Sequence, residues 1–163
     1  MKIAVISDTH DNKNAIREII KSVNSEGISI VIHAGDHISP FTIDWMSEMK
    51  AKVFGVAGNN DGEKELLKKK YLDYGWAFSY NTLVVNLGAP IVVTHGTDQR
   101  IVEALIKSGE YKVVIAGHLH KPIIEYYDEV LYLNPGEACG YLTGKRTYAI
   151  LKMPEKTVEI IEF

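Results

Sequence analysis

The sequence contains a single cysteine, Cys139, so no disulfide can form within its 163 residues. Such a chain is typical of a reducing compartment, and we expect a cytoplasmic protein. The sequence also lacks any apolar run near the roughly 20 residues that cross a membrane. The apolar start, residues 1–7, is short, meets Asp8 at once and shows no cleavage-like site, so we expect neither a signal peptide nor a membrane partner.

An excess of basic side chains is absent too. The chain has 18 Lys and Arg residues against 21 Asp and Glu, which gives a formal net charge of −3. Strong nonspecific binding to nucleic acid depends on a basic surface, and we expect none here. A small anionic substrate is still compatible with this charge, because a bound metal supplies positive charge locally.

No internal repeat, low-complexity segment or linker rich in Pro, Gly and Ser divides the chain. Hydrophobic residues make up 46% of it, which is sufficient for a packed core and argues against disorder. We therefore predict a single domain over residues 1–163.

Five apolar runs rich in Ile and Val share one layout, because polar residues that can bind metals follow each of them directly. The runs cover residues 2–6, 30–32, 53–56, 91–93 and 113–116. Short continuous runs of this kind favour strands that are buried on both faces. Strands that alternate with helices predict an α/β fold.

Helical periodicity lies between these runs. It covers residues 13–24, the segment with Ile43, Met46 and Met49, and residues 63–71. A fourth helix is predicted with Ile101, Ala104, Leu105 and Ser108 on one face, ending at Gly109. Further strands at 123–127, 130–134, 147–151 and 158–163 suggest a mixed or antiparallel second sheet. We predict two sheets with the helices outside them.

The polar residues after the five runs form a candidate metal centre, because ligands of α/β sheets bind beyond the carboxyl ends of the strands. The candidates are Asp8, His10, Asp36, Asn59, His95, His118 and His120. Imidazole mixed with carboxylate suits Mn, Fe, Zn, Co or Ni better than Mg or Ca. Seven ligands exceed what one ion with an open position needs, so we expect two divalent ions that share a carboxylate. Their net positive charge would attract an anionic phosphoryl group.

These motifs, in this order, resemble the calcineurin-like metallophosphoesterase superfamily. The blocks are Asp8-Thr9-His10, Gly35-Asp36, Gly58-Asn59-Asn60-Asp61, His95 and Gly117-His118-Leu119-His120. Together with the small size and Asn134-Pro135-Gly136, they resemble the minimal YfcE-type and archaeal phosphodiesterase branch. The resemblance implies a four-layer α-β-β-α sandwich. It also implies that small phosphodiesters are hydrolysed by attack of a metal-bridging hydroxide.

The family's roles carry over onto matching positions. Asp8, His10 and His120 would hold the first metal, Asn59, His95 and His118 the second, and Asp36 would bridge them. The candidate catalytic residues are Asp36, Asn60 and Asp61. Asn60 stands where the family usually has a histidine that protonates the leaving group or binds phosphate, and an amide cannot act as an acid. We therefore expect slow turnover and a preference for leaving groups that need little protonation.

Structural interpretations compete with several of these assignments. Asp8 and His10 could cap the first helix, since Asp is a good cap. His33 matches no family ligand and is expected to be structural; for His37 a surface position is favoured over a proton donor. Cys139 is expected to pack in its loop, since nothing near it in the sequence supports a thiolate ligand. The default for the basic stretch of Lys64, Lys68, Lys69 and Lys70 is a solvated helix face, with substrate steering as the alternative.

Two other functions are compatible with the same motifs. The metal pair would also serve a phosphomonoesterase or a nuclease. A protein-interaction scaffold similar to the retromer's metallophosphoesterase-like subunit is a third reading, although all seven ligand positions here keep metal-binding side chains. A homo-oligomer is compatible with the family branch, but no stretch of the sequence argues for one.

Overall fold

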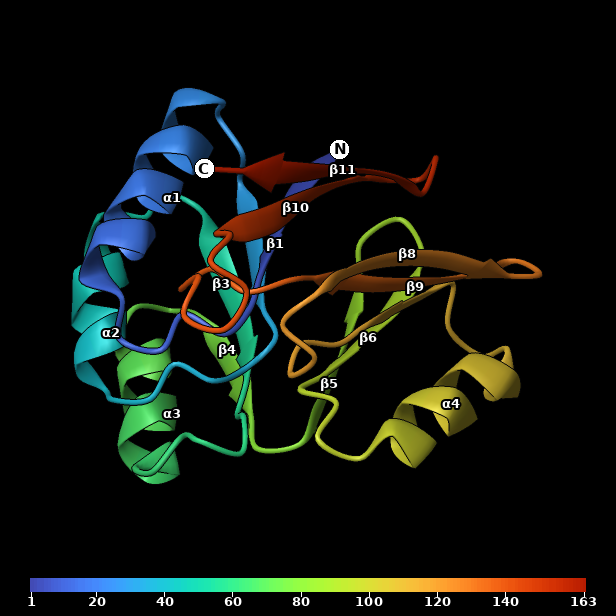
Figure 1. The fold of residues 1–163 in the computed structure, drawn as a ribbon, viewed down its shortest axis with the longest axis horizontal. Helices are drawn as coiled ribbons and strands as arrows, with labels where there is room; N and C mark the ends of the chain where they lie inside the picture. Colours follow the sequence, from blue (N-terminus) through green and yellow to red (C-terminus); the bar gives the residue numbers. More distant parts are fainter.

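A computed structural model describes residues 1–163 as two β-sheets packed face to face, with helices on both outer sides (Figure 1). The six-stranded sheet has the order β11-β10-β1-β2-β3-β4, and the five-stranded sheet has the order β5-β6-β7-β9-β8. The first contains β1 (Lys2–Ile6), β2 (Ile30–His33), β3 (Lys52–Val56), β4 (Ala77–Ser79), β10 (Thr147–Lys152) and β11 (Thr157–Glu162). The second contains β5 (Thr82–Asn86), β6 (Pro90–Thr94), β7 (Val113–Ile115), β8 (Pro122–Tyr127) and β9 (Val130–Pro135).

The helices form the two outer layers. The helices α1 (Lys13–Ser25), α2 (Phe41–Trp45) and α3 (Lys64–Asp73), with the 3₁₀ turn η1 (Met46–Glu48), cover the six-stranded sheet, and α4 (Gln99–Ser108) covers the other (Figure 1). A hydrophobic cluster fills each of the three interfaces: Ile6, Ile19 and Leu67 belong to the first, Ile32 and Leu131 to the one between the sheets. The third cluster, under α4, is the smallest. The predicted four-layer α-β-β-α sandwich of two mixed sheets is confirmed.

The strand directions bring the carboxyl ends of the parallel strands of both sheets to the same side of the molecule. Strands β1, β2, β3 and β4 run parallel, as do β6, β7 and β9. The predicted five apolar runs are the central strands of these parallel sets, and they are almost fully buried. The loops that follow them therefore gather at the carboxyl ends of both sheets.

The last third of the chain is divided differently from the prediction. Its four strands exist, but they do not form one sheet: β8 and β9 extend the five-stranded sheet, whereas β10 pairs antiparallel with β1 and carries β11. The short strands β4 and β5 were not predicted. Which sheet a strand joins depends on contacts far away in sequence, and strand periodicity does not report them.

The predicted face of the fourth helix is wrong in its rotation. Val102 is the buried residue of α4, with Leu105 and Ile106 packed beside it, whereas Ile101 is 51% exposed. Both Ile101 and Val102 begin an apolar stripe at helical spacing, so the periodicity alone allows either. The helix ends as predicted at Gly109, whose φ of 67° is left-handed. None of the four helices has the length and hydropathy needed to span a bilayer.

Candidate metal centre

The seven predicted ligands come from five loops at the seam between the two sheets. Asp8 and His10 follow β1, Asp36 follows β2 and Asn59 follows β3, all in the six-stranded sheet. His95 follows β6 and the pair His118 and His120 follows β7, both in the five-stranded sheet. Each sheet thus supplies one side of the candidate centre.

Four of the side chains converge on a common point. One ligand atom each from Asp8, His10, Asp36 and His120 lies within 4.8 Å of all the others. His120 Nε2 lies 3.2 Å from Asp8 Oδ1, and His10 Nε2 lies 3.4 Å from Asp36 Oδ2. Asp8 Oδ1 and His10 Nε2 are buried without a hydrogen-bond partner. Buried polar atoms normally have partners, so a pair of unpartnered ligand atoms facing the same point fits a bound cation.

A second group shares Asp36 and lies on its other side. His95 Nε2 is 3.4 Å from Asp36 Oδ1 and 3.0 Å from Asn59 Oδ1. His118 lies beside them, with its ring centroid 5.2 Å from that of His95. Asp36 therefore presents one carboxylate oxygen to each group, which is the arrangement a bridging ligand requires.

Two glycines make this crowding possible. A Cβ on Gly58 would lie 2.0 Å from Asp36 Oδ1, and a Cβ on Gly117 would lie 1.9 Å from Ser7 Oγ and 2.8 Å from Asp8 Oδ2. Any larger residue at either position would displace a candidate ligand or the hydroxyl that holds it. The glycines of the motifs are therefore explained by close approach at the centre.

The backbone at the centre is held in an uncommon conformation. Five candidate ligands have positive φ: Asp8 (53°), His10 (41°), Asp36 (59°), His118 (68°) and His120 (58°). Each such residue is strained by about 1–3 kcal/mol, and strain of this kind concentrates at functional sites. The alternative that Asp8 or His10 caps the first helix is wrong, because Asn12 is the N-cap of α1 and accepts from Ala15 N.

Hydrogen bonds orient the candidate ligands. Ser7 Oγ and His118 N donate to Asp8 Oδ2, which leaves Oδ1 for the centre. His95 Nδ1 donates to Ala34 O at 2.7 Å, so its Nε2 is free to act as a ligand. His120 Nδ1 lies 2.7 Å from the Glu137 carboxylate, with the same consequence. Carboxylates and carbonyls behind metal-binding histidines fix ring orientation and raise ligand basicity.

The charges of the centre shift its pKa values. Burial would raise the pKa of Asp36, but hydrogen bonds from His95 and Asn60 outweigh it and lower the pKa to about 2. The neighbouring Asp8 carboxylate raises the pKa of His10. For His95, burial favours the neutral ring, and the contact with Asp36 outweighs this and raises the pKa. A divalent cation would replace protons on these rings, so metal binding would weaken as the pH falls.

Glu137 was missed by the sequence analysis. It is fully buried after β9 and, besides His120, it accepts hydrogen bonds from Thr143 N and Oγ1, both at 2.6 Å, and from Leu142 N. Burial would raise its pKa, but these bonds lower it to about 2. The sequence feature that could have identified Glu137 is its position directly after Asn134-Pro135-Gly136.

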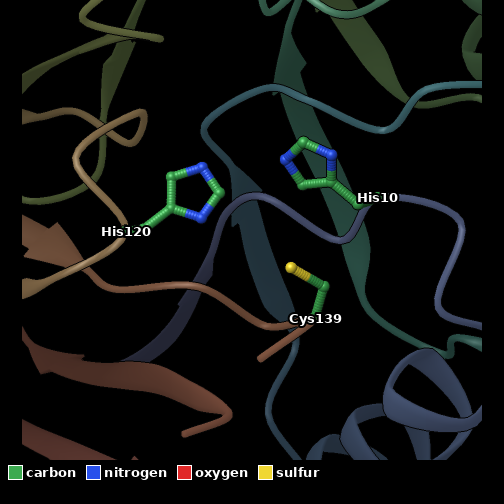
Figure 2. Close-up of side chains that lie close together, drawn as sticks. All are labelled: His10, His120 and Cys139. Atoms are coloured by element: carbon green, nitrogen blue, oxygen red, sulfur yellow. The ribbon is translucent and has the colours of Figure 1, made fainter. Parts of the chain in front are cut away.

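Cys139 lies closer to the centre than the sequence indicated. His10, His120 and Cys139 form a second cluster whose ligand atoms lie within 4.8 Å of one another (Figure 2). Figure 2 shows the sulfur directed toward the space between the two imidazoles. Burial raises the pKa of the thiol to about 12. The cysteine packs in its loop, as expected, but two candidate ligands do lie near it.

The residues of the third motif hold Asp36 and the neighbouring loops in place. Asn60 donates from its backbone N and from Nδ2 to Asp36. The Asp61 carboxylate accepts from Gly58 N and Ile38 N, both at 2.7 Å, and faces His37 Nδ1 at 3.1 Å. Asp61 therefore ties the β2 and β3 loops together behind the centre.

Both remaining histidines of this region are buried. The expected surface position of His37 is wrong: its ring stacks on His33, with centroids 3.7 Å apart, and its Nε2 contacts the Tyr71 hydroxyl at 2.7 Å. His37 faces Asp61 and Tyr71, which makes it part of the loop support. His33 has a structural setting, since it contacts Thr9 Oγ1 and accepts from Gly35 N.

The chain belongs to the calcineurin-like phosphoesterase superfamily, whose domain model matches residues 1–156. It is 42% identical to phosphodiesterase MJ0936 of Methanocaldococcus jannaschii over 158 residues, which cover 96% of this chain and 95% of that protein. A solved structure described as a novel archaeal phosphodiesterase superimposes with a TM-score of 0.96 at 40% identity and covers 100% of both chains.

More distant structures share the fold alone. YfcE, a phosphoesterase from E. coli, has a TM-score of 0.71 at 18% identity and covers 99% of this chain and 98% of its own. Vps29 proteins, from Entamoeba histolytica among others, are 15–20% identical with TM-scores of 0.70–0.73, over 99–100% of this chain and 96–99% of theirs.

Proposed function

We propose that this protein is a metal-dependent phosphodiesterase that hydrolyses small phosphodiesters at the seam between its two sheets. The observation that carries the proposal is the convergence of Asp8, His10, Asp36 and His120 on one point, with two ligand atoms buried and unpartnered. The 42% identity to a protein named a phosphodiesterase, over nearly the full length of both, supports the reaction class.

The donor set supports two divalent transition-metal ions, from among Mn, Ni, Fe, Co and Zn. Asp8, His10 and His120 would hold one ion, Asn59, His95 and His118 would hold the other, and Asp36 would bridge them. When bound, such ions polarise phosphoryl oxygens and lower the pKa of a coordinated water. The single unpaired cysteine supports a cytoplasmic location.

The residues around Asp36 hold its carboxylate and the neighbouring loop in place. Asp36 accepts two hydrogen bonds from Asn60, which fixes the carboxylate plane. The Asn60 amide can donate hydrogen bonds, but it cannot deliver a proton. The candidate catalytic roles therefore divide into Asp36 as bridging ligand, Asn60 as hydrogen-bond donor, and Asp61 as the group that holds the loop carrying Asn60.

The scaffold alternative has less support. A protein without catalysis would tolerate other residues at the ligand positions, yet all seven keep metal-binding side chains. Five of them also have a strained backbone, which a scaffold does not need. Phosphomonoester hydrolysis by the same centre is compatible with the geometry, so the test must separate the two esters.

The test is metal removal with chelator, followed by assays of a chromogenic phosphodiester and a chromogenic monoester with Mn, Ni, Co, Zn or Mg restored singly. We expect diester cleavage to return with transition metals and to exceed monoester cleavage. Asp36→Asn should keep the circular dichroism spectrum and lose at least 100-fold in kcat/KM, since even residues behind metal ligands cost about 10–100-fold. Wild-type activity in that variant, or no turnover with any metal despite two ions bound per chain, would overturn the proposal.

A further inference from the structure

The four lysines of the basic stretch in α3, Lys64, Lys68, Lys69 and Lys70, make different contacts. Lys69 pairs with Asp73 at 2.6 Å, Lys70 pairs with Asp44 at 2.6 Å, and Lys68 lies over the Tyr80 ring, 4.7 Å from its centroid. Lys64 differs from all three. Its ammonium has no hydrogen bond, ion pair or aromatic contact within the chain, although the residue is half-buried. A solvated helix face therefore explains three of the four lysines at most.

Lys64 lines a cavity of about 330 Å³ that reaches the candidate metal centre. Two of the predicted ligands, Asn59 and His95, form one wall of this cavity. Lys64 and these two candidate ligands thus line the same space. A phosphodiester held at the centre would have room here for one of its two ester arms.

The other residues that line the cavity indicate which kind of ester arm would fit. Asn81, Thr82 and Thr97 contribute amide and hydroxyl groups, and Ile101, exposed because α4 turns Val102 inward, contributes an apolar contact. Asp98 is the one acidic residue in the lining, and its charge is paired with Arg100 at 2.6 Å. The unpaired charge of the cavity is therefore positive, and it comes from Lys64.

We propose that this cavity is the subsite for one ester arm of the substrate, and that Lys64 selects arms that carry an anionic substituent, a carboxylate or a phosphate. This inference rests on the proposed phosphodiesterase function and adds the class of substrate. A lysine ammonium suits a carboxylate or phosphate as a point charge, without fixed bidentate geometry. The arm's polar middle would contact Asn81 and Thr97.

The experiment compares two diesters with the same chromophore. These are 4-nitrophenyl propyl phosphate and 4-nitrophenyl 2-carboxyethyl phosphate, which differ in a terminal methyl group against a carboxylate. With the metal-loaded wild type, we expect kcat/KM to be about tenfold higher for the carboxylate substrate, the size of one charge-assisted hydrogen bond. In Lys64→Gln this ratio should fall to about one, and Lys64→Arg should restore much of it. Lys69→Gln removes the same charge from the same helix outside the cavity, and should keep the wild-type ratio.

Each possible result of this comparison either supports or contradicts the proposed role of Lys64. An unchanged ratio in Lys64→Gln would overturn the proposal. An equal loss on both substrates would overturn it as well, because Lys64 would then act on the scissile phosphoryl group itself. An equal fall in the ratio for Lys69→Gln would show general electrostatic steering instead. Absence of any diester cleavage by the wild type with every metal would refute the phosphodiesterase function, which is a separate outcome from active enzyme without the preference.

Discussion

Replacing Glu137 by Gln should weaken metal binding although Glu137 is not a predicted ligand. The Glu137 carboxylate can only accept, so His120 must donate from Nδ1 across the 2.7 Å contact. That tautomer leaves the Nε2 lone pair directed at the centre, 3.2 Å from Asp8 Oδ1. Glu137, which lies on a different loop, thus sets the tautomer in which His120 can bind a metal.

A glutamine has the same shape but only one accepting oxygen. The Oε1 position of Glu137 accepts from Thr143 N and Thr143 Oγ1, both at 2.6 Å, so the remaining oxygen should stay there. The amide NH₂ would then face His120 and favour the tautomer with its proton on Nε2. Metal binding must displace that proton, and the loss of a partner behind a ligand costs about 10–100-fold in affinity. This corresponds to about 1.4–2.7 kcal/mol.

The assay is calorimetric titration of chelator-stripped protein with Mn²⁺ and with Zn²⁺ at pH 7.5. Glu129→Gln is the matched control, because Glu129 is exposed and its carboxylate pairs with Lys112 at the surface, away from the centre. We expect wild-type affinity in the control and a tenfold or greater loss in Glu137→Gln. Wild-type affinity in Glu137→Gln, with the circular dichroism spectrum retained, would refute the tautomer argument.

Two further predictions concern the third motif. Asp61→Asn should lower the free energy of unfolding by about 3 kcal/mol at pH 7, because it breaks a buried, hydrogen-bonded charge contact; Asp73→Asn, in an exposed pair, is the control. Hydrogen bonds and His37 outweigh burial and lower the pKa of Asp61, so its stabilisation is complete above the unfolded value near 4 and declines as the pH falls below it. Urea titrations from pH 3 to pH 7 should therefore show the two curves converging toward low pH, and a constant separation would contradict the argument. Asn60→His should raise kcat for a diester with a poor alkoxide leaving group by about tenfold or more, and change 4-nitrophenyl release little, since general acid catalysis matters when the leaving group needs a proton. No gain on the poor leaving group would remove the explanation offered for slow turnover.

The candidate centre was predictable because its information is local. Each predicted ligand follows a buried strand directly, and parallel strands bring their carboxyl ends to one edge whatever the loops do. Asp8, Asp36 and His120 therefore meet as the motif order indicated. The metal-ligand roles themselves stay predictions that the titrations above would test.

What was missed depends on contacts between distant segments. Glu137 reaches His120 across 17 residues, and Cys139 reaches His10 from the other end of the chain. His37 is buried because Tyr71, from α3, closes over it. The predicted rotation of α4 was wrong because its five apolar residues allow two stripes, and the packing of Val102 against the five-stranded sheet decides between them. None of these contacts leaves a periodic signal.

The candidate metal centre lies at the seam between the two sheets, so a metal bound there would also connect them. Asp8, His10, Asp36 and Asn59 follow strands of one sheet, whereas His95, His118 and His120 follow strands of the other. Two ions held across that seam would link the two sheets to each other through their ligands. The free energy of binding would then add directly to the free energy of folding. The stability of the fold would then depend on the concentration of free metal, as the occupancy of the centre does.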